Sequence, residues 1–412
     1  MNSFCVGKCF LKDTSIADSF DNFGDVGFCK INLTEWKMRI LHTADLHLDS
    51  AFSSFGKKDA EHYRELGRTL LKNIFECAKH EKCEMILIAG DLFDSKFVSN
   101  DTRTLFASLV RGAGIPVVIS PGNHDPYSEN SFYTLMEKEN IENLYVFSAP
   151  ELQIFDFDEL RVRVFGYAFT SPVINESPLL EASLPEDNGY LKLLCAHADM
   201  SSPLSRYAPI SLAELSRFGF AYSALGHIHN RDEKEDAAGR VRYSGFAEGR
   251  SFDELGEGGI FVVDVDELSC EAKRILISSR AFYIDELNVS QIVGNIKEKL
   301  CQHIKDKNYR YGTYLRLVLT GTAEPQSIKT VKSLAEELCE DTGLEYLEIE
   351  DSTLPIFDGK YLEKDVTVRG EIYRTLLPSL TSADAEVRKK ATLALKIALS
   401  AIDGNNVFDV VN

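Results

Sequence analysis

The stretch ILHTADLHLD, residues 40–49, places residues able to bind a metal ion directly after an apolar run. Asp45, His47 and Asp49 occupy alternate positions in it. In an extended chain, side chains two residues apart point to the same face. We therefore expect these three potential ligands to lie on one side of the end of a buried strand.

Similar residues follow later apolar runs. They are Gly90-Asp91, Gly122-Asn123-His124, His197 and Gly226-His227-Ile228-His229. Together with His47, these blocks hold five of the nine histidines of the chain. Carboxylates and imidazoles gathered at strand ends would be costly to bury unless they coordinated a metal ion. We therefore favour a metal site over the alternative, a set of hydrogen-bonded core residues and solvated loops.

Alternating strand and helix patterns would bring these blocks together. Residues 59–82 have the apolar spacing of an amphipathic helix, and residues 102–110 predict a second helix. Apolar strands begin at Met38 and within residues 84–91 and 115–125, each ending in a polar block. This order indicates parallel βαβ units, in which ligands bind at the carboxyl ends of the strands.

The strand patterns that follow are shorter, at residues 161–167 and 190–197. Strands at residues 240–245, 258–266 and 271–279 indicate a meander, which we expect to form the second sheet. The predicted fold class is therefore α/β, with two packed sheets flanked by helices in a four-layer αββα sandwich.

The organisation of the chain changes near residue 279. A helix at 290–304, a strand at 313–321, a helix at 325–339 and a strand at 344–351 predict a small α+β unit. The predicted domains are an N-terminal extension (1–37), a main domain (38–279), the α+β unit (280–354) and a helical C-terminal region (355–412). We expect the extension to be poorly ordered or to precede a native start at Met38. The apolar-striped helix at 386–402 is interpreted as packing on its own domain, with partner docking as the alternative.

Composition limits the partners. The chain has 412 residues and a net charge of −19, so its average surface repels phosphates, although bound divalent ions or a basic partner could supply positive charge. No run approaches the roughly 20 apolar residues that cross a membrane, and the N-terminus shows no secretory signal. The nine cysteines lack C-x-x-C pairs, which fits reduced thiols in a cytoplasmic protein.

The five blocks DLH, GDLFD, GNHD, AH and GHIH together resemble the calcineurin-like metallophosphoesterases, over about residues 38–265. The resemblance implies two divalent metal ions, manganese by preference, with iron or zinc as alternatives. By position in the blocks, one metal would be bound by Asp45, His47 and His229, and the other by Asn123, His197 and His227.

The same resemblance implies that Asp91 bridges the two metals. It also implies that His124 is the catalytic histidine and that Asp94 orients it. Asp49 lies beyond the family's ligands, so we interpret it as a loop or supporting residue. Two metals 3.5–4 Å apart, roughly, can clamp a phosphodiester and activate a water molecule, so the expected reaction is metal-dependent phosphodiester hydrolysis.

The segments ILHTADLHLDS and GDLFDS resemble the SbcD-like DNA repair exonuclease branch of this superfamily. The segment YSGFAEGRSFDELGEGG resembles members of the YhaO type, and the unit after residue 280 resembles their capping domain. This resemblance implies DNA as the substrate and an SMC-type coiled-coil ATPase as the partner, with a homodimer also open. The alternatives are a small-molecule phosphodiesterase acting on cyclic nucleotides, which the net charge favours, and a non-catalytic scaffold.

Overall fold

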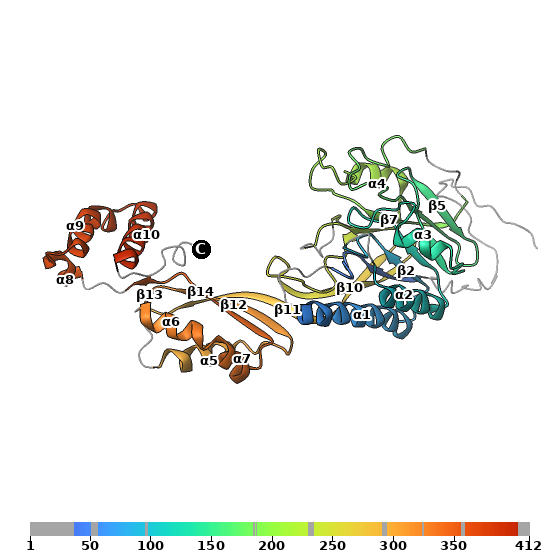
Figure 1. Cartoon of the computed structure of the whole chain (residues 1–412). Coiled ribbons are helices and arrows are strands. Elements are labelled where there is room, and N and C mark those ends of the chain that lie inside the picture. Colours follow the sequence, from blue (N-terminus) through green and yellow to red (C-terminus); the bar gives the residue numbers. More distant parts are fainter. Residues whose placement is uncertain are drawn as a thin grey trace, which may run out of the picture. The chain divides into compact units, whose positions relative to one another are not determined.

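The computed structural model describes residues 37–50, 57–94, 98–183, 186, 188–229, 235–290, 295–323, 325–355 and 359–402 (Figure 1). The predicted N-terminal extension lies outside these residues, apart from Lys37, and so do residues 403–412. Among the described helices, none combines the length and the apolar character that crossing a membrane requires.

The larger sheet has eight strands, and four consecutive strands at one side of it form the predicted series of parallel βαβ units. In spatial order the strands are β14 (Tyr346–Asp351), β12 (Thr313–Thr320), β11 (Cys270–Asn288), β10 (Gly256–Val265), β1 (Met38–Thr43), β2 (Met85–Ile88), β3 (Val117–Ile119) and β4 (Leu144–Val146). Strands β1 to β4 are parallel. They are connected through α1 (Lys57–His80), α2 (Asn100–Ala113) and α3 (Phe132–Glu137).

The smaller sheet has five strands, in chain order. They are β5 (Gln153–Phe157), β6 (Val162–Gly166), β7 (Leu191–His197), β8 (Tyr222–Gly226) and β9 (Val241–Tyr243), with α4 (Leu212–Phe218) between β7 and β8. Strands β6 to β9 are parallel, so β7 and β8 end at the same edge.

Alternation along the strands divides the apolar side chains among three cores. Leu41 of β1 packs with α1 and α2 on one face of the larger sheet. The neighbouring Ile40 packs in a second core with Val164 and Leu193 of the smaller sheet. Leu194 points the other way, into a third core beneath α4. Because successive side chains of a strand face opposite sides, the layers run helix, sheet, sheet, helix, which confirms the predicted αββα sandwich.

The predicted second-sheet meander is wrong. Strand β9 joins the smaller sheet beside β8, whereas β10 pairs antiparallel with β1, and β11 pairs with β10. Residues Gly258–Val263 of β10 are buried, because this strand lies between β1 and β11 in the larger sheet. Proximity in sequence suggested one meander, but pairing with a strand more than 200 residues earlier decides the position of β10.

Strand β11 has 19 residues and continues through residue 279, so the predicted boundary falls inside one strand. Its second half pairs in parallel with β12, which pairs with β14. Helices α5 (Ile296–Asp306), α6 (Pro325–Ser333) and α7 (Ala335–Thr342) share a separate apolar core with these strands. The helix predicted at 325–339 is thus two helices, interrupted at Leu334.

The chain then forms the short pair β13 (Thr322–Ala323) and β15 (Leu354–Pro355), followed by three helices. These are α8 (Gly359–Lys364), α9 (Val368–Leu380) and α10 (Ala385–Ile402). A small core of its own, centred on Leu362, Leu395 and Leu399, holds them together. The division of the chain into domains remains our proposal.

Candidate metal centre

The loop that follows β1 differs from the extended strand end that the alternation of ligands predicted. Asp45, His47 and Asp49 all adopt positive φ, at 53°, 44° and 56°. The intervening backbone follows the next loop, since Asp45 N donates to Gly90 O and His47 N to Asp91 O, both at 3.0 Å. Every second residue of this loop is left-handed, so the loop is not an extended strand. Asp45 and His47 therefore do not lie together because they share one face of a strand.

Asp49 is not part of the gathered ligands. Its Oδ2 accepts a hydrogen bond from Ser99 N at 2.7 Å, and its Oδ1 accepts one from Thr102 Oγ1 at 2.9 Å. Both partners lie at the beginning of α2, where unpaired backbone N–H groups favour a carboxylate. Asp49 therefore ties this loop to the N-terminus of a helix.

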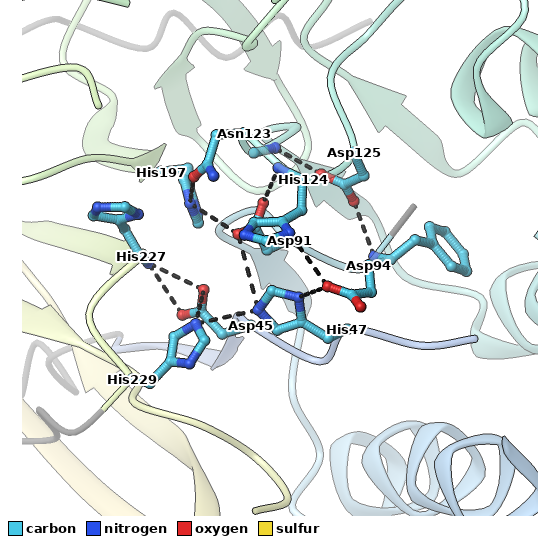
Figure 2. A network of polar contacts seen from close by, with 12 residues as sticks. Asp45, His47, Asp91, Asp94, Asn123, His124, Asp125, His197, His227 and His229 are labelled. Carbon is cyan, nitrogen blue, oxygen red and sulfur yellow. Dashed lines mark hydrogen bonds and ion pairs between the residues drawn. The ribbon is translucent and has the colours of Figure 1, made fainter. Parts of the chain in front are cut away.

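Asp45, His47 and His229 form the first ligand cluster (Figure 2). The Nε2 atoms of His47 and His229 are 3.1 Å apart, and His229 Nε2 lies 3.6 Å from Asp45 Oδ1. Each ring directs its Nδ1 to a different carboxylate: His47 to Asp94 Oδ1 at 3.2 Å, and His229 to Glu254 Oε1 at 2.7 Å. With both Nδ1–H groups donated, two Nε2 lone pairs face each other beside a carboxylate. This donor set fits a cation.

Asp91, Asn123 and His197 form the second cluster. His197 Nδ1 donates to the Ala89 carbonyl at 3.0 Å, which leaves Nε2 as an acceptor. That Nε2 lies 2.9 Å from Asn123 Oδ1 and 3.3 Å from Asp91 Oδ2. Three acceptor atoms at these distances again fit a divalent cation.

Asp91 lies between the two clusters. Its Oδ2, which is 3.3 Å from His197, is also 3.9 Å from His47 Nε2 of the first cluster. Its Oδ1 accepts a hydrogen bond from the backbone N of His124 at 2.9 Å. The carboxylate is thus buried and held between the two clusters.

His227 is close to the two clusters, but its ring nitrogens do not belong to either of them. Its backbone N donates to both oxygens of Asp45, at 3.2 and 3.1 Å. The ring lies 5.1 Å from that of His197 and 4.8 Å from that of Tyr207, between centroids. In Figure 2 it stands apart from Asp91. Among the described residues, the groups whose ligand atoms approach within 4.8 Å of one another do not include His227.

His124 lies at the mouth of the site. Its Nδ1 is 3.2 Å from Asp94 Oδ1, the oxygen that also contacts His47 Nδ1. The His124 side chain is 47% exposed, whereas that of His47 is 1% exposed. Asp94 therefore holds one buried ring among the candidate ligands and one ring open to substrate.

The carboxylates and imidazoles of the site change each other's acidity. Burial opposes ionisation of Asp91, but the neighbouring His197 outweighs it and lowers the pKa of Asp91. Burial lowers the pKa of His197, and Asp91 outweighs it to raise that pKa to about 9. For His229, burial is outweighed by the neighbouring carboxylates of Asp45 and Glu254, and its pKa rises to about 10. Without a cation, protons balance the buried carboxylates, and a divalent ion would take their place.

The glycines of the motifs are needed for close approach. A Cβ on Gly122 would lie 2.1 Å from Asp91 Oδ1, and one on Gly90 would lie 2.4 Å from His197 Nδ1. Gly90 also has a φ of +90°, which other residues rarely adopt. The absent side chains therefore leave the space that the candidate ligands occupy.

Two supporting residues were not found from sequence. Glu254 is 25 positions after His229, a spacing that carries no periodic signal, and it lies within the segment YSGFAEGRSFDELGEGG without a motif of its own. Asp125 closes the GNHD block and accepts hydrogen bonds from Gly122 N at 2.8 Å and Phe93 N at 3.1 Å. Burial, with the nearby Asp91, raises the pKa of Asp125 to about 7. Asp125 thus joins the GNHD loop to the GDLFD loop.

Comparison with known proteins agrees with this geometry. The family model of the calcineurin-like phosphoesterases matches residues 38–231. The uncharacterized metallophosphoesterase YhaO of Bacillus subtilis (strain 168) is 27% identical over 323 residues, which are 74% of this chain and 76% of that protein.

Two further relatives are named as nucleases or repair proteins. The DNA double-strand break repair protein Mre11 of Aeropyrum pernix is 27% identical over 273 residues, 61% of this chain and 64% of its own. The SbcD component of the nuclease SbcCD of Staphylococcus epidermidis is 25% identical over 307 residues, 66% and 76% of the two chains. The two clusters and the family match lead to one conclusion: residues 38–231 match the calcineurin-like phosphoesterases, and the chain is a metal-dependent hydrolase with candidate sites for divalent ions.

Proposed function

We propose that this protein is a two-metal phosphodiesterase that cuts DNA, as the nuclease component of an SbcCD-type repair complex. The observation that carries the proposal is the pair of ligand clusters with Asp91 between them and the half-exposed His124 beside them. The names of the Mre11 and SbcCD relatives support DNA as the substrate.

We assign Asp45, His47 and His229 to one metal ion and Asn123, His197 and His227 to the other, with Asp91 shared. Binding through His227 requires its ring to turn toward His197. Two divalent ions, manganese by preference, would neutralise charge on a phosphodiester and lower the pKa of a water molecule. The buried carboxylates and the hydrogen-bonded imidazole rings keep the donor atoms in position.

His124 is proposed to donate a proton to the leaving oxygen. A hydrogen bond to Asp94 raises the pKa of His124, because the carboxylate stabilises the charged ring. With Nδ1 held by Asp94, the Nε2–H of the protonated ring is the proton available to substrate. Its exposure at the mouth of the site suits this role.

The partner we propose is a coiled-coil ATPase of the SMC type. A net charge of −19 disfavours tight binding of DNA by this chain alone, so a partner with basic surfaces would hold the DNA. The C-terminal helices expose the apolar side chains of Val368, Val387, Leu393 and Ile402, and we propose that these side chains take part in docking. A cytoplasmic location and a homodimer within the complex belong to the same proposal.

The test is hydrolysis with manganese by the wild type and by His124→Ala, on bis-p-nitrophenyl phosphate and on linear duplex DNA with the ATPase present. We expect His124→Ala to retain both metal ions while turnover falls roughly 10²–10⁴-fold, the usual scale for a positioned acid–base group. His80→Ala is the control, because the His80 side chain is 84% exposed at the end of α1.

The outcomes separate the alternatives. Equal loss of metal and activity in His124→Ala would place His124 among the ligands. Efficient cleavage of a cyclic nucleotide, with no cleavage of DNA ends even when the ATPase is present, would favour a small-molecule phosphodiesterase, which the acidic surface also suits. Absence of hydrolysis of every phosphodiester with both ions bound would favour a scaffold.

A further inference from the structure

Glu254 lies in the segment between β9 and β10, outside the five motif blocks. The residue is 4% exposed, so its carboxylate is almost fully removed from water. Its Oε1 accepts hydrogen bonds from His229 Nδ1 and from Arg250 Nη2, both at 2.7 Å, and its Oε2 accepts one from Arg250 N at 2.8 Å. A buried carboxylate with this many partners is held in one orientation.

The contact with Glu254 determines which nitrogen of His229 is free. An ionised carboxylate only accepts hydrogen bonds, so the Nδ1 of His229 carries the hydrogen in this pair. The lone pair of the neutral ring is then on Nε2, which lies 3.1 Å from His47 Nε2 and 3.6 Å from Asp45 Oδ1. Glu254 thereby acts on His229 as Asp94 acts on His47.

Arg250 stabilises the buried negative charge of Glu254. Its guanidinium balances the buried charge of Glu254, and its Nη1 reaches to 3.8 Å from Asp94 Oδ1. A buried carboxylate without a cationic neighbour would be costly in free energy. Arg250 therefore joins the two carboxylates that support the two imidazoles of the first cluster.

We propose that Glu254 is a positioning residue for metal binding: held by Arg250, it orients His229 so that Nε2 faces the ion shared with Asp45 and His47. This inference rests on the proposed metal ligands and adds a residue to them. It assigns a function to a segment that has none of the family's motif residues.

The test is the affinity for Mn²⁺ alone, measured by isothermal titration calorimetry on the full chain and on Glu254→Gln. The amide keeps the size of the side chain but removes its charge and its pairing with Arg250. We expect one of the two ions to bind roughly 10–100-fold more weakly, the usual effect of losing such a supporting contact, while the other ion is less affected.

Glu248→Gln is the matched control. Like Glu254, Glu248 is buried, lies in the segment between β9 and β10 and pairs with an arginine, Arg280, at 3.0 Å. Unlike Glu254, it does not contact His229. If the loss arises only from breaking a buried ion pair, Glu248→Gln will weaken Mn²⁺ binding as much as Glu254→Gln, and the proposal is overturned.

A double variant supplies a readout that a structural role would not give. In the His229→Ala background, Glu254→Gln should cause no further loss of Mn²⁺ affinity, because the ring that it orients is gone; additive losses would contradict the proposal. If Glu254→Gln does not fold, Glu254→Asp is measured in the same way. It keeps the charge beside Arg250 but retracts the carboxylate from His229, so we expect a smaller loss of the same ion, and unchanged affinity would overturn the proposal.

The two proposals fail in different ways. If the wild type does not bind two Mn²⁺ ions, the proposed metal centre is wrong. If the wild type binds two ions and Glu254→Gln binds both with unchanged affinity, the metal centre stands and only the role of Glu254 is wrong.

Discussion

Asp91 is the residue at which the two ligand clusters meet. Its Oδ2 lies 3.3 Å from His197 and 3.9 Å from His47, and its Oδ1 is held by the backbone N of His124. Of the residues in the two clusters, His229 contacts only members of the first. We therefore expect Asp91 to contribute to the binding of both metal ions and His229 to the binding of one.

We expect Asp91→Asn to reduce the metal content of the purified protein from two ions toward none, and His229→Asn to reduce it to one. Both variants carry asparagine in place of the candidate ligand, so the difference reports the number of ions each residue contacts. Metal content per chain, determined by elemental analysis after gel filtration, is the measurement. Two ions retained by Asp91→Asn would show that Asp91 is not a bridging ligand.

At the scale of elements, some loops at the strand ends require glycine, because a Cβ atom would collide with the neighbouring loop. Gly122 and Gly112 are both in the same βαβ region but differ in their surroundings. A Cβ on Gly122 would lie 2.1 Å from Asp91 Oδ1, whereas one on Gly112, in α2, would meet nothing within 4 Å.

We expect Gly122→Ala to lower the free energy of unfolding by about 1–3 kcal/mol, the scale of overpacking, and to weaken Mn²⁺ binding because Asp91 must move. Gly112→Ala is the control and should be neutral or stabilising by up to about 1 kcal/mol, since alanine is favoured in helices. Thermal unfolding and Mn²⁺ titration measure both effects. Equal affinity for Mn²⁺ in the two variants would contradict the close approach to Asp91.

The two sheets are joined by a buried polar contact at His42 of β1. Its ring Nδ1 accepts from Tyr222 Oη at 2.9 Å, and its Nε2–H donates to Leu225 O at 3.2 Å, both on β8. Burial lowers the pKa of His42 to about 3. In the unfolded chain a histidine titrates near pH 6.5, so below that pH the unfolded state binds a proton that the folded state does not.

The stability contributed by the neutral His42 is therefore present above pH 6.5 and is lost as the pH falls toward 3. We expect the free energy of unfolding of the wild type to fall between pH 6.5 and 4.5 by about 2 kcal/mol more than that of His42→Gln. Urea unfolding at several pH values measures the difference. His80→Gln, at an exposed position, should retain the pH dependence of the wild type; the same slope in His42→Gln would refute the assignment.

At the scale of the whole molecule, the C-terminal helices have a core separate from those of the sandwich. Leu395 and Leu399 of α10 pack with α8 and α9, and Lys396 Nζ donates to Thr353 O at 2.8 Å. The apolar cores beneath the metal centre contain no residue of α10. Removing α10 should therefore leave the metal centre intact.

We expect deletion of residues 381–412 to preserve hydrolysis of bis-p-nitrophenyl phosphate and to abolish association with the ATPase. Leu393→Asp tests the same surface without deletion, because Leu393 is 43% exposed whereas Leu395 is fully buried. Gel filtration with the ATPase and phosphodiesterase assays measure the two properties. Unchanged association in both variants would eliminate the docking role, and loss of hydrolysis would mean that α10 supports the sandwich.

Much of the site could be predicted from sequence because it depends on local order. Parallel strands β1, β2 and β3 place their carboxyl ends at one edge, so Asp45, Asp91 and Asn123 converge once the strand and helix pattern is recognised. The αββα layering was also predicted, although the meander assigned to the second sheet was wrong. The prediction did not need the true backbone of the Asp45–Asp49 loop, which proved to be left-handed at every second residue.

Only the tertiary structure decided the features that depend on long-range pairing. Strand β10 joins β1 across more than 200 residues, and this pairing delivers the segment carrying Glu254 and Arg250 to His229. The attachment of Asp49 to α2 and the orientation of the His227 ring are likewise set by neighbours distant in sequence. Residue type and spacing identify a candidate metal ligand. The residue that orients this ligand depends on which strands and loops pack together in the folded chain.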